Sequence, residues 1–427
     1  MRVLVVGGGG REHALVWALA KSPAIERIYA APGNPGIGEL ARCVSISAGD
    51  VGGLADFAER ESMDLTVVGP EAPLVAGLAN ELAARGLPVF GPARDGALIE
   101  GSKAYARKVC ARHGIPGARG ADFMDPAKAR AYLEELEAPY VVKADGLAAG
   151  KGVIIAETLA EAEAAIRACL VDRAFGEAGG RVVIEEHLEG EEVSAIALTD
   201  GRTVVALAPS QDHKRVGEGD TGPNTGGMGA YSPVPAVDPD TWRRIETEIL
   251  QATVAGLRAE GTDYRGVLYA GLMLTADGPK VLEFNCRFGD PETQALIPRV
   301  RSDLLELLRA CTDGTVGQRE VEWDPRPCVT VVAASEGYPG PSPAGLEITG
   351  LAEAGLIPDA VVFHAGTSGK DGRVTTAGGR VLAVSALGAD LGEARARAYD
   401  AIGRIGFEGM HYRRDIGERA MRERASG

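Results

Sequence analysis

The chain has 427 residues, enough for two to four domains that each bury a core of their own. Its formal net charge of −15 argues against a protein that coats nucleic acid or binds an anionic membrane surface. The six cysteines are scattered and include no C-x-x-C pair, so they fit neither a disulfide framework nor a zinc site. No apolar run approaches the ~18 residues that span a bilayer. These features predict a cytoplasmic protein of several domains that binds neither nucleic acid nor membrane.

Residues 2–100 alternate short apolar runs with helical patterns. Strands are expected at RVLVV, RIYAAP, DLTVV and LPVF, with a helix at REHALVWALAKS after the first of them. Strands that alternate with helices predict a parallel, Rossmann-like sheet. Such sheets bind ligands in the loops at the carboxyl ends of their strands. Those loops are GGGGREH, APGN and VGPEAPL.

The turn GGGGREHA precedes the first helix. The dinucleotide fingerprint G-x-G-x-x-G could use Gly7 and Gly9, but its third glycine is replaced by Glu12. This departure argues against an oxidoreductase. Glycines before a helix still favour an anion site made of backbone N–H groups and the helix dipole, and a sugar phosphate fits it better than a pyrophosphate.

A helix with Ser102 as its N-cap is expected at SKAYARKVCARHG, and the stretch KADGLAAGKGVII follows it. This stretch departs from a phosphate-binding P-loop, because three residues rather than four separate Gly146 from Gly150 and Gly152 stands where Ser or Thr should follow Lys151. The residues after it are also β-like. A β-hairpin flap that folds over a polyphosphate is expected. An ordinary hairpin with an exposed lysine is the alternative, and Lys143 on the preceding strand favours the anion site.

An acidic segment comes next, and a long segment with several basic residues follows it. VIEEHLEGEEVS is rich in glutamates, and four of them, Glu185, Glu186, Glu191 and Glu192, could accept hydrogen bonds from a nucleoside or could form a solvated acidic turn. Residues 210–233 show no hydrophobic periodicity and are too long for an ordinary connection, which predicts a binding loop or a disordered one. Asp212 beside His213, Lys214 and Arg215 favours binding.

The stretch KVLEFNCRFGDPET reads as a strand followed by a turn. Alternation along a strand puts Glu283 and Asn285 on one face. One carboxylate and one amide oxygen suit Mg²⁺, which takes few protein ligands beside substrate phosphates. Arg287 falls on the same face and could clamp a carboxylate or phosphate. Asp290 and Glu292 follow in the turn.

A proline-rich link, DPRPC, opens the last segment, which holds several strands and one helix. The expected domains are therefore residues 1–101, residues 102–323 with a flap near 120–190, and residues 324–427.

Eight runs together resemble one enzyme family. They are GREHAL, APGN, VGPEAPL, GSKAYARK, KADGLAAGKGV, SQDHKR, TGPNTGGMGAYSP and EFNCRFGDPETQ. The chain looks like a phosphoribosylamine–glycine ligase, an ATP-grasp enzyme of de novo purine synthesis, over essentially its whole length. Gly8 stands where the family often has Asn. The resemblance implies an α/β and α+β multidomain protein, with a Rossmann-like N-terminal sheet, a central ATP-grasp fold and a small β-rich α+β C-terminal domain.

The resemblance also implies the chemistry. Glycine's carboxylate would attack the γ-phosphate of ATP to give glycyl phosphate, and the nitrogen of 5-phosphoribosylamine would then displace phosphate. The flap would exclude water from the acyl phosphate. Arg287 and Asp212 would hold glycine's carboxylate and amine, and these two residues with Lys151 would be catalytic.

The resemblance implies further residue roles. ATP would contact Lys103, Lys143, Gly146, Gly150, Lys151, Gly152, Glu185, Glu186, Leu188 and Glu192. The other substrates would contact Gly9, Gly10, Glu12, Asn34, Glu71, Asp212, Lys214 and Arg287. Glu283 and Asn285 would hold Mg²⁺ or Mn²⁺. The protein would be a monomer or a weak homodimer.

Three alternatives stay open from the sequence. An ATP-grasp ligase could act on another carboxylate or amine, although the substrate loops argue against this. A nucleotide-binding sensor without chemistry would not need both the Glu283–Asn285 pair and Arg287. A hydride-transfer enzyme is disfavoured by the incomplete glycine fingerprint.

Overall fold

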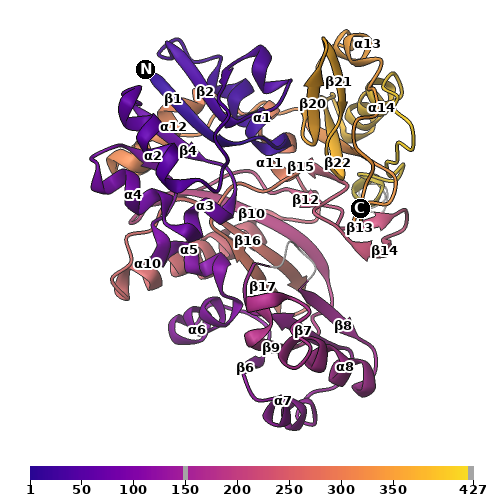
Figure 1. Ribbon diagram of the computed structural model, residues 1–427. Helices are drawn as coiled ribbons and strands as arrows, with labels where there is room; N and C mark the ends of the chain where they lie inside the picture. Colours follow the sequence, from indigo (N-terminus) through magenta and orange to yellow (C-terminus); the bar gives the residue numbers. More distant parts are fainter. Residues whose placement is uncertain (148–151, 422–427) are drawn as a thin grey trace.

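A computed structural model describes residues 1–147 and 152–421. Its N-terminal part is a parallel five-stranded sheet of order β3-β2-β1-β4-β5 (Figure 1). The strands are β1 (Arg2–Gly7), β2 (Arg27–Pro32), β3 (Arg42–Cys43), β4 (Leu65–Val68) and β5 (Val89–Phe90). The helices are α1 (Gly10–Leu19), α2 (Val51–Arg60), α3 (Glu71–Ala76), α4 (Leu78–Ala84) and α5 (Arg94–Gly101).

This sheet confirms the Rossmann-like prediction. The side chains of β1 from Val3 to Val6 are fully buried, as expected for a parallel strand that is covered on both faces. The strand order reverses at β1: β2 and β3 follow on one side of it, and β4 and β5 on the other. The carboxyl ends of these three strands therefore meet at one edge, where such sheets bind ligands.

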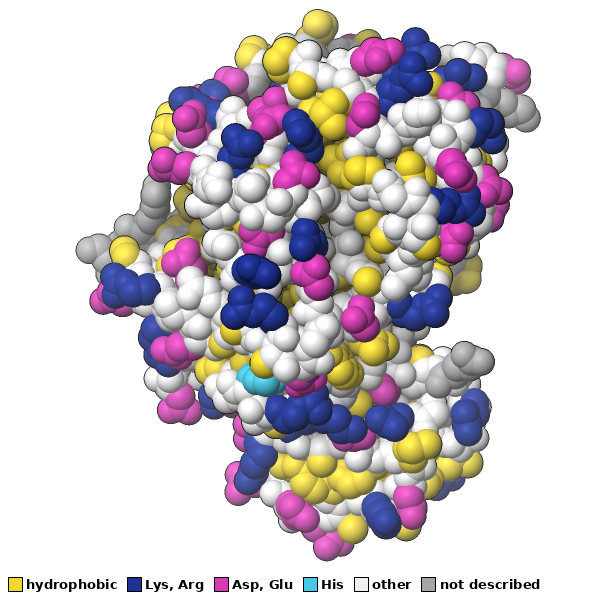
Figure 2. Space-filling view, turned by 90° about the vertical axis from the view of Figure 1, so that its left-hand side faces the viewer, with side chains coloured by type: hydrophobic (Ala, Val, Ile, Leu, Met, Phe, Trp, Pro, Cys, Tyr) yellow, Lys and Arg dark blue, Asp and Glu magenta, His cyan; other side chains and the backbone are white. Residues whose placement is uncertain are grey.

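The central part contains two antiparallel four-stranded sheets. The first has the order β11-β10-β16-β17, with β10 (Glu191–Asp200), β11 (Val204–Ala206), β16 (Arg265–Thr275) and β17 (Gly278–Asn285). The second has the order β6-β9-β7-β8, with β6 (Gly120–Phe123), β7 (Tyr140–Ala144), β8 (Val153–Ala156) and β9 (Val182–Glu186). With α7 (Pro126–Leu133) and α8 (Leu159–Leu170), the second sheet forms a lobe that a notch sets off from the body (Figures 1 and 2).

Two helices pack beside the central sheets, and the first of them confirms a sequence prediction. Helix α6 (Lys103–His113) begins after Ser102, whose hydroxyl accepts a hydrogen bond from the N–H of Tyr105 at 3.1 Å. A second, continuous helix combines α9 (Pro239–Arg244), a π-helical stretch at Ile245–Gln251 and α10 (Ala252–Ala259). Among the described residues, no helix is both long and apolar enough to cross a bilayer.

Residues 210–233, predicted as a long binding loop or a disordered one, contain short strands in the structure. They form the short strands β12 (Gln211–Asp212), β13 (Arg215–Gly217), β14 (Thr221–Asn224) and β15 (Gly229–Ser232). β13 and β14 pair as a hairpin, whereas β12 and β15 join the C-terminal sheet. Strands of two to four residues are too short to show a periodicity, which is why the sequence did not indicate them.

The C-terminal sheet has the order β12-β15-β18-β22-β19. Its later strands are β18 (Cys328–Ala334), β19 (Ala360–His364) and β22 (Arg380–Leu387). Helix α14 (Leu391–Ile402) packs on this sheet, and a hairpin of β20 (Thr367–Lys370) and β21 (Arg373–Thr376) lies beside it. Helix α13 (Leu351–Gly355) adjoins β19, and α11 (Glu292–Leu296) and α12 (Leu304–Asp313) connect this region to the rest of the body.

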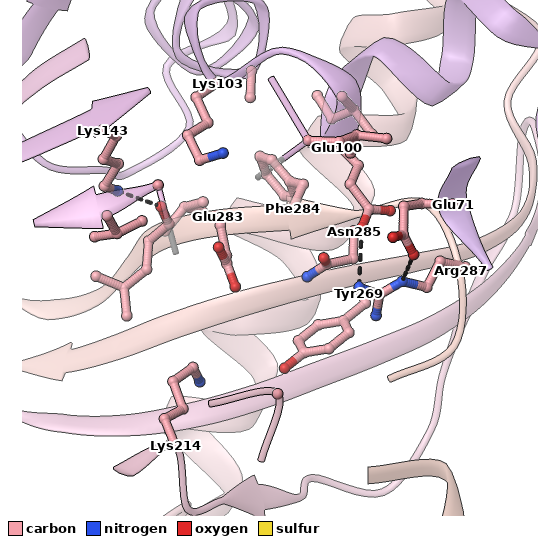
Figure 3. A pocket seen from close by; sticks show the side chains of 18 of the residues that line it. Glu71, Glu100, Lys103, Lys143, Lys214, Tyr269, Glu283, Phe284, Asn285 and Arg287 are labelled. Atoms are coloured by element: carbon pink, nitrogen blue, oxygen red, sulfur yellow. Dashed lines mark hydrogen bonds and ion pairs between the residues drawn. The ribbon is translucent and has the colours of Figure 1, made fainter. Parts of the chain in front are cut away.

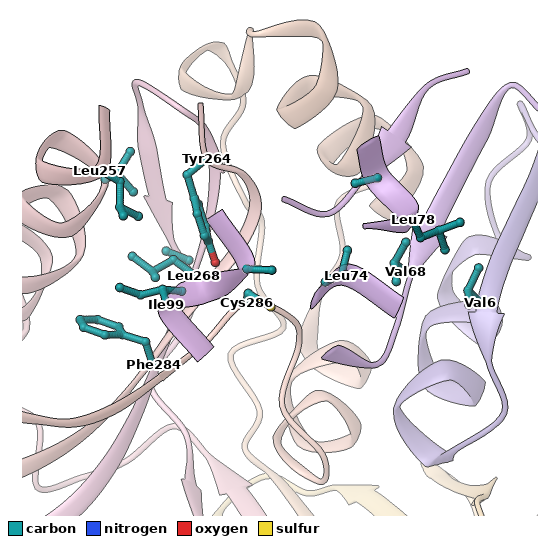
Figure 4. Packing of buried hydrophobic residues seen from close by; sticks show 14 of the residues in the cluster. Val6, Val68, Leu74, Leu78, Ile99, Leu257, Tyr264, Leu268, Phe284 and Cys286 are labelled. Atoms are coloured by element: carbon teal, nitrogen blue, oxygen red, sulfur yellow. The ribbon is translucent and has the colours of Figure 1, made fainter. Parts of the chain in front are cut away.

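One hydrophobic core joins the N-terminal and central sheets (Figure 4). It runs from Val6 and Val68 through Leu74 to Leu268 and Phe284. A second cluster packs the N-terminal and central sheets against Phe363 and Ala383 of the C-terminal sheet. The C-terminal part has a further cluster, and the lobe has one of its own. The shared core holds β17 in a fixed position relative to the ligand-binding edge of the N-terminal sheet.

Candidate active site

A cavity of about 690 Å³ lies where these parts meet. Its lining comes from the N-terminal loops, α6, the lobe, β17 and the C-terminal part. Predicted site residues that line it are Glu71, Lys103, Lys143, Gly146, Gly152, Glu185, Asp212, Lys214, Glu283, Asn285 and Arg287. Segments far apart in the sequence therefore converge on one cavity.

Glu283 and Asn285 project from β17 into the cavity (Figure 3). The intervening Phe284 and the following Cys286 belong to the hydrophobic core, so the predicted alternation is confirmed. Neither the Glu283 carboxylate nor the Asn285 amide makes a hydrogen bond or ion pair to another described residue. Two uncommitted oxygen donors fit a divalent cation such as Mg²⁺. Among the described residues, no group of three or more His, Cys, Asp and Glu side chains forms a metal cluster.

Two lysines line the cavity above β17 (Figure 3). The Lys103 ammonium donates to the carbonyl of Gly146 at 3.0 Å, and burial lowers the pKa of this lysine although Glu283 opposes the shift. Lys143 donates to the carbonyl of Leu282 at 2.9 Å. Both cations are held close to the strand that carries the metal-binding candidates. Of the flap tip, Gly150 and Lys151 lie outside the described residues.

The glutamates of the acidic segment after the flap differ in whether they line the cavity. Glu185 lines the cavity, where it pairs with Lys143 at 2.6 Å and Arg107 at 3.0 Å. Glu186 instead accepts a hydrogen bond from the N–H of Arg119 at 2.8 Å. The described cavity lining does not include Glu186, Leu188 or Glu192, so contact of these three with ATP stays a prediction.

Arg287 is held by two carboxylates rather than left free for a substrate. Its Nε lies 3.1 Å from Oε2 of Glu71, and its Nη2 lies 3.0 Å from Oε1 of Glu100 (Figure 3). Its Nη1 donates to the carbonyl of Phe288 at 3.2 Å. Glu100 also accepts a hydrogen bond from the N–H of Cys286 at 2.8 Å, and burial raises the pKa of this carboxyl despite Arg287.

Glu100 carries no predicted role from the sequence. It lies near the end of helix α5, directly before the GSKAYARK run, and this proximity to a recognised motif was its one signal.

A second ionic cluster lies across the cavity from Glu283. Lys214 sits 2.9 Å from Oδ1 of Asp212 and 2.9 Å from Oε2 of Glu192. Nearby, Glu292 accepts a hydrogen bond from the Tyr269 hydroxyl at 2.6 Å. Glu292 and Tyr269 line the cavity, but no role was predicted for either.

The glycine turn before α1 does not present an open anion site. The Glu12 carboxylate folds back, accepting from the N–H of Gly9 at 2.7 Å and from Nε of Arg11 at 2.5 Å. Glu12 is 2% exposed and already occupies the positive end of the helix. A phosphate placed there would meet a like charge, because the predicted binding residue itself caps the helix.

Asn34 is also committed within the protein. Its amide donates to the carbonyls of Gly8 at 2.9 Å and His364 at 2.8 Å, which ties the N-terminal turn to β19. The described cavity lining does not include Gly9, Gly10, Glu12 or Asn34, so their contact with a substrate stays a prediction.

The C-terminal part supplies one wall of the cavity through Arg380, Tyr338 and Pro339. The Arg380 guanidinium donates to the carbonyl of Asp290 at 2.7 Å and to that of Gly226 at 2.6 Å. It also lies 3.3 Å from the Asp290 carboxylate. Sequence patterns could not connect these positions, because they lie 90 and 154 residues apart.

Family models match almost the whole chain. Residues 1–100 match the phosphoribosylglycinamide synthetase N domain, residues 101–293 the ATP-grasp (A) domain, and residues 328–419 the C domain of the same enzyme. A phosphoribosylamine–glycine ligase of Allochromatium vinosum is 54% identical over 100% of both chains, and one of Vibrio vulnificus is 53% identical over 99% of both.

Solved structures agree with this assignment. The crystal structure of phosphoribosylamine–glycine ligase from Thermotoga maritima is 36% identical with a TM-score of 0.87, and the match covers 97% of this chain and 100% of that one. The biotin carboxylase domain of a Hydrogenobacter thermophilus carboxylase is 17% identical with a TM-score of 0.74, over 96% of this chain and 91% of that one, which is a likeness of fold alone. The chain belongs to the phosphoribosylglycinamide synthetase family, the phosphoribosylamine–glycine ligases.

Proposed function

We infer that the cavity joins 5-phosphoribosylamine to glycine with conversion of ATP to ADP and phosphate, a step of purine biosynthesis. The observation that carries this inference is the pair of uncommitted donors, Glu283 and Asn285, facing a cavity that two lysines also line. ATP-grasp enzymes bind ATP with a divalent metal, and this donor pair suits such a complex. A nucleotide sensor would not need the acidic and basic clusters that line the rest of the cavity.

Lys103 and Lys143 are placed to neutralise the phosphates of ATP. Their ammonium groups approach the cavity from α6 and β7, on the side of β17 that carries Glu283 and Asn285. Those two residues would hold Mg²⁺ or Mn²⁺, which supplies charge neutralisation of the phosphates during transfer. Glu185 pairs with Lys143 and so limits how far this lysine can swing.

Glycine and phosphoribosylamine bind on the remaining walls in this proposal. Arg287 stays our candidate for glycine's carboxylate, although all three of its guanidinium nitrogens have partners and one of them would have to be exchanged. Glu71 is available to accept hydrogen bonds from ribose hydroxyls, since its carboxylate lines the same wall. Asp212 was predicted to contact glycine's amine, and its place on the cavity wall equally allows contact with the amine of phosphoribosylamine. The protein would act in the cytoplasm as a monomer or weak homodimer.

The test is ADP release with ATP, Mg²⁺, glycine and freshly prepared phosphoribosylamine, omitting each component in turn. We expect sustained ADP release with the complete mixture, and its loss when either glycine or the amine is left out. Tight ATP binding without turnover in any mixture would contradict the proposed reaction. A repeat with Mn²⁺ in place of Mg²⁺ would show which cation the pair of donors prefers.

A further inference from the structure

The ionic cluster across the cavity from β17 carries an excess of negative charge. It contains three carboxylates, Asp212, Glu192 and Glu292, and a single ammonium, that of Lys214. Lys214 binds Oδ1 of Asp212 and Oε2 of Glu192 at 2.9 Å each. Glu292 is tied to the Tyr269 hydroxyl at 2.6 Å. This arrangement is costly to bury unless one carboxylate can take up a proton.

Asp212 is the member of the cluster that can exchange a proton with the cavity. Its side chain is 7% exposed and lines the cavity wall. Lys214 anchors Oδ1, whereas Oδ2 has no hydrogen-bond partner among the described residues. Burial raises the pKa of Asp212 to about 7, with Glu292 and Glu192 adding to the shift and Lys214 opposing it.

The second half of the proposed reaction requires a proton acceptor. The amine nitrogen of phosphoribosylamine attacks the carbonyl carbon of glycyl phosphate, and a C–N bond forms. The nitrogen of the adduct then carries one proton too many. That proton must leave as the bond from carbon to the phosphate oxygen breaks and phosphate departs with the electron pair. A group suited to this task stands on the cavity wall and changes protonation near the working pH.

A permanent anchor for glycine's ammonium would have different properties. It would need a carboxylate that stays ionised well below neutral pH, so that the ion pair is always available. Asp212 is poorly suited to that role, because its surroundings favour the protonated form. The same surroundings suit a group that is alternately protonated and deprotonated during turnover.

We propose that Asp212 accepts the proton from the attacking amine of phosphoribosylamine, with Lys214 as a positioning residue that holds its other oxygen. The proton moves from the nitrogen to Oδ2 and reaches solvent once the product has left. This role deepens the proposed function and rests on it. It also distinguishes Asp212 from Lys103 and Lys143, which serve the phosphoryl transfer from ATP.

The test separates the two halves of the reaction in three proteins: the wild type, Asp212→Asn and the exposed control Asp240→Asn, whose side chain is 85% exposed. Positional isotope exchange in ATP labelled at its β–γ bridge, with glycine present, reports reversible formation of glycyl phosphate. Rapid-quench single turnovers report amide formation after phosphoribosylamine is added. Asparagine keeps the shape of the side chain and leaves Glu192 paired with Lys214, so melting temperatures of all three proteins should agree.

We expect Asp212→Asn to keep its isotope exchange within about twofold while its rate of amide formation falls roughly 100-fold or more, within the range typical of general base catalysis. The wild-type rate should rise with pH through about 7 and level off, and the variant should lack this rise. Lys214, Glu192, Glu292 and Tyr269 face Asp212 and set the midpoint.

Other outcomes would overturn the assignment in distinguishable ways. If Asp212→Asn lost isotope exchange and amide formation equally, Asp212 would serve to bind glycine rather than to accept the proton. If the variant kept the wild-type rate of amide formation, or kept the rise of that rate near pH 7, Asp212 would not be the proton acceptor. Absence of glycine-dependent exchange in the wild type would instead overturn the acyl-phosphate reaction and this inference with it.

Discussion

Replacing Arg287 by Gln should destabilise the protein in a pH-dependent way. Arg287 is 18% exposed and pairs with Glu71 and Glu100 at 3.1 and 3.0 Å. Glutamine keeps polar atoms and much of the length but removes the charge. Glu71 is 31% exposed and can be hydrated, whereas Glu100 is 7% exposed and cannot. The cost therefore falls mainly on Glu100.

The magnitude follows from the protonation of Glu100. Burial already raises the pKa of Glu100 with Arg287 present, and loss of Arg287 raises it further. An unfolded glutamate has a pKa of about 4.3, and holding it protonated costs about 1.4 kcal/mol per pH unit above that value. The upper bound is about 3.7 kcal/mol at pH 7 and about 1 kcal/mol at pH 5. The former lies within the roughly 3–5 kcal/mol typical of a broken buried ion pair.

The sign follows from linkage. A carboxyl whose folded pKa lies above its unfolded value makes folding take up a proton, so stability falls as pH rises through that interval. We expect a loss of about 3 kcal/mol at pH 7 and about 1 kcal/mol at pH 5, measured by urea unfolding followed by circular dichroism. Arg243→Gln, at a side chain that is 69% exposed, should change little at either pH. Equal losses for Arg287→Gln at both pH values would refute the reasoning.

Three further changes test other parts of the cavity. Glu283→Ala should abolish turnover without lowering the melting temperature, because it removes a metal ligand rather than core volume; full ADP release would exclude the metal assignment. Lys151→Ala should raise KM for ATP or lower kcat at an unchanged melting temperature, and an unfolded variant would indicate a structural role instead. Arg380 lies on one of the walls that our proposal leaves to glycine and phosphoribosylamine, and we place the latter beside it. Arg380→Gln also frees the carbonyls of Gly226 and Asp290, and should raise KM for phosphoribosylamine about tenfold, roughly the effect of a lost charge-assisted hydrogen bond. An equal rise in KM for ATP would contradict that placement.

Local patterns in the sequence determined much of the fold. Apolar runs alternating with helical segments predicted the parallel N-terminal sheet, and the N-cap at Ser102 marked the start of α6. The two-residue period of β17 predicted that Glu283 and Asn285 share one face, and both line the cavity. These features depend on residues that are close together in the sequence, so the sequence alone can predict them.

Tertiary structure decided how charges are paired within the cavity. The partners Glu71 and Arg287 are 216 residues apart, and whether an arginine is free or held by carboxylates depends on which distant segment packs beside it. For the same reason the sequence predicted an anion site at the glycine turn, where Glu12 in fact caps the helix.

The position of the C-terminal part was likewise beyond local patterns. β12 and β15 belong by sequence to the central segment, yet they extend the C-terminal sheet and carry Asp212 to the cavity wall. Arg380 reaches the same cavity from β22. The sequence by itself determined which chemical groups are present and which face of each element they occupy. Only the packing of distant segments, driven by burial of apolar surface that no local pattern specifies, decided which of those groups meet.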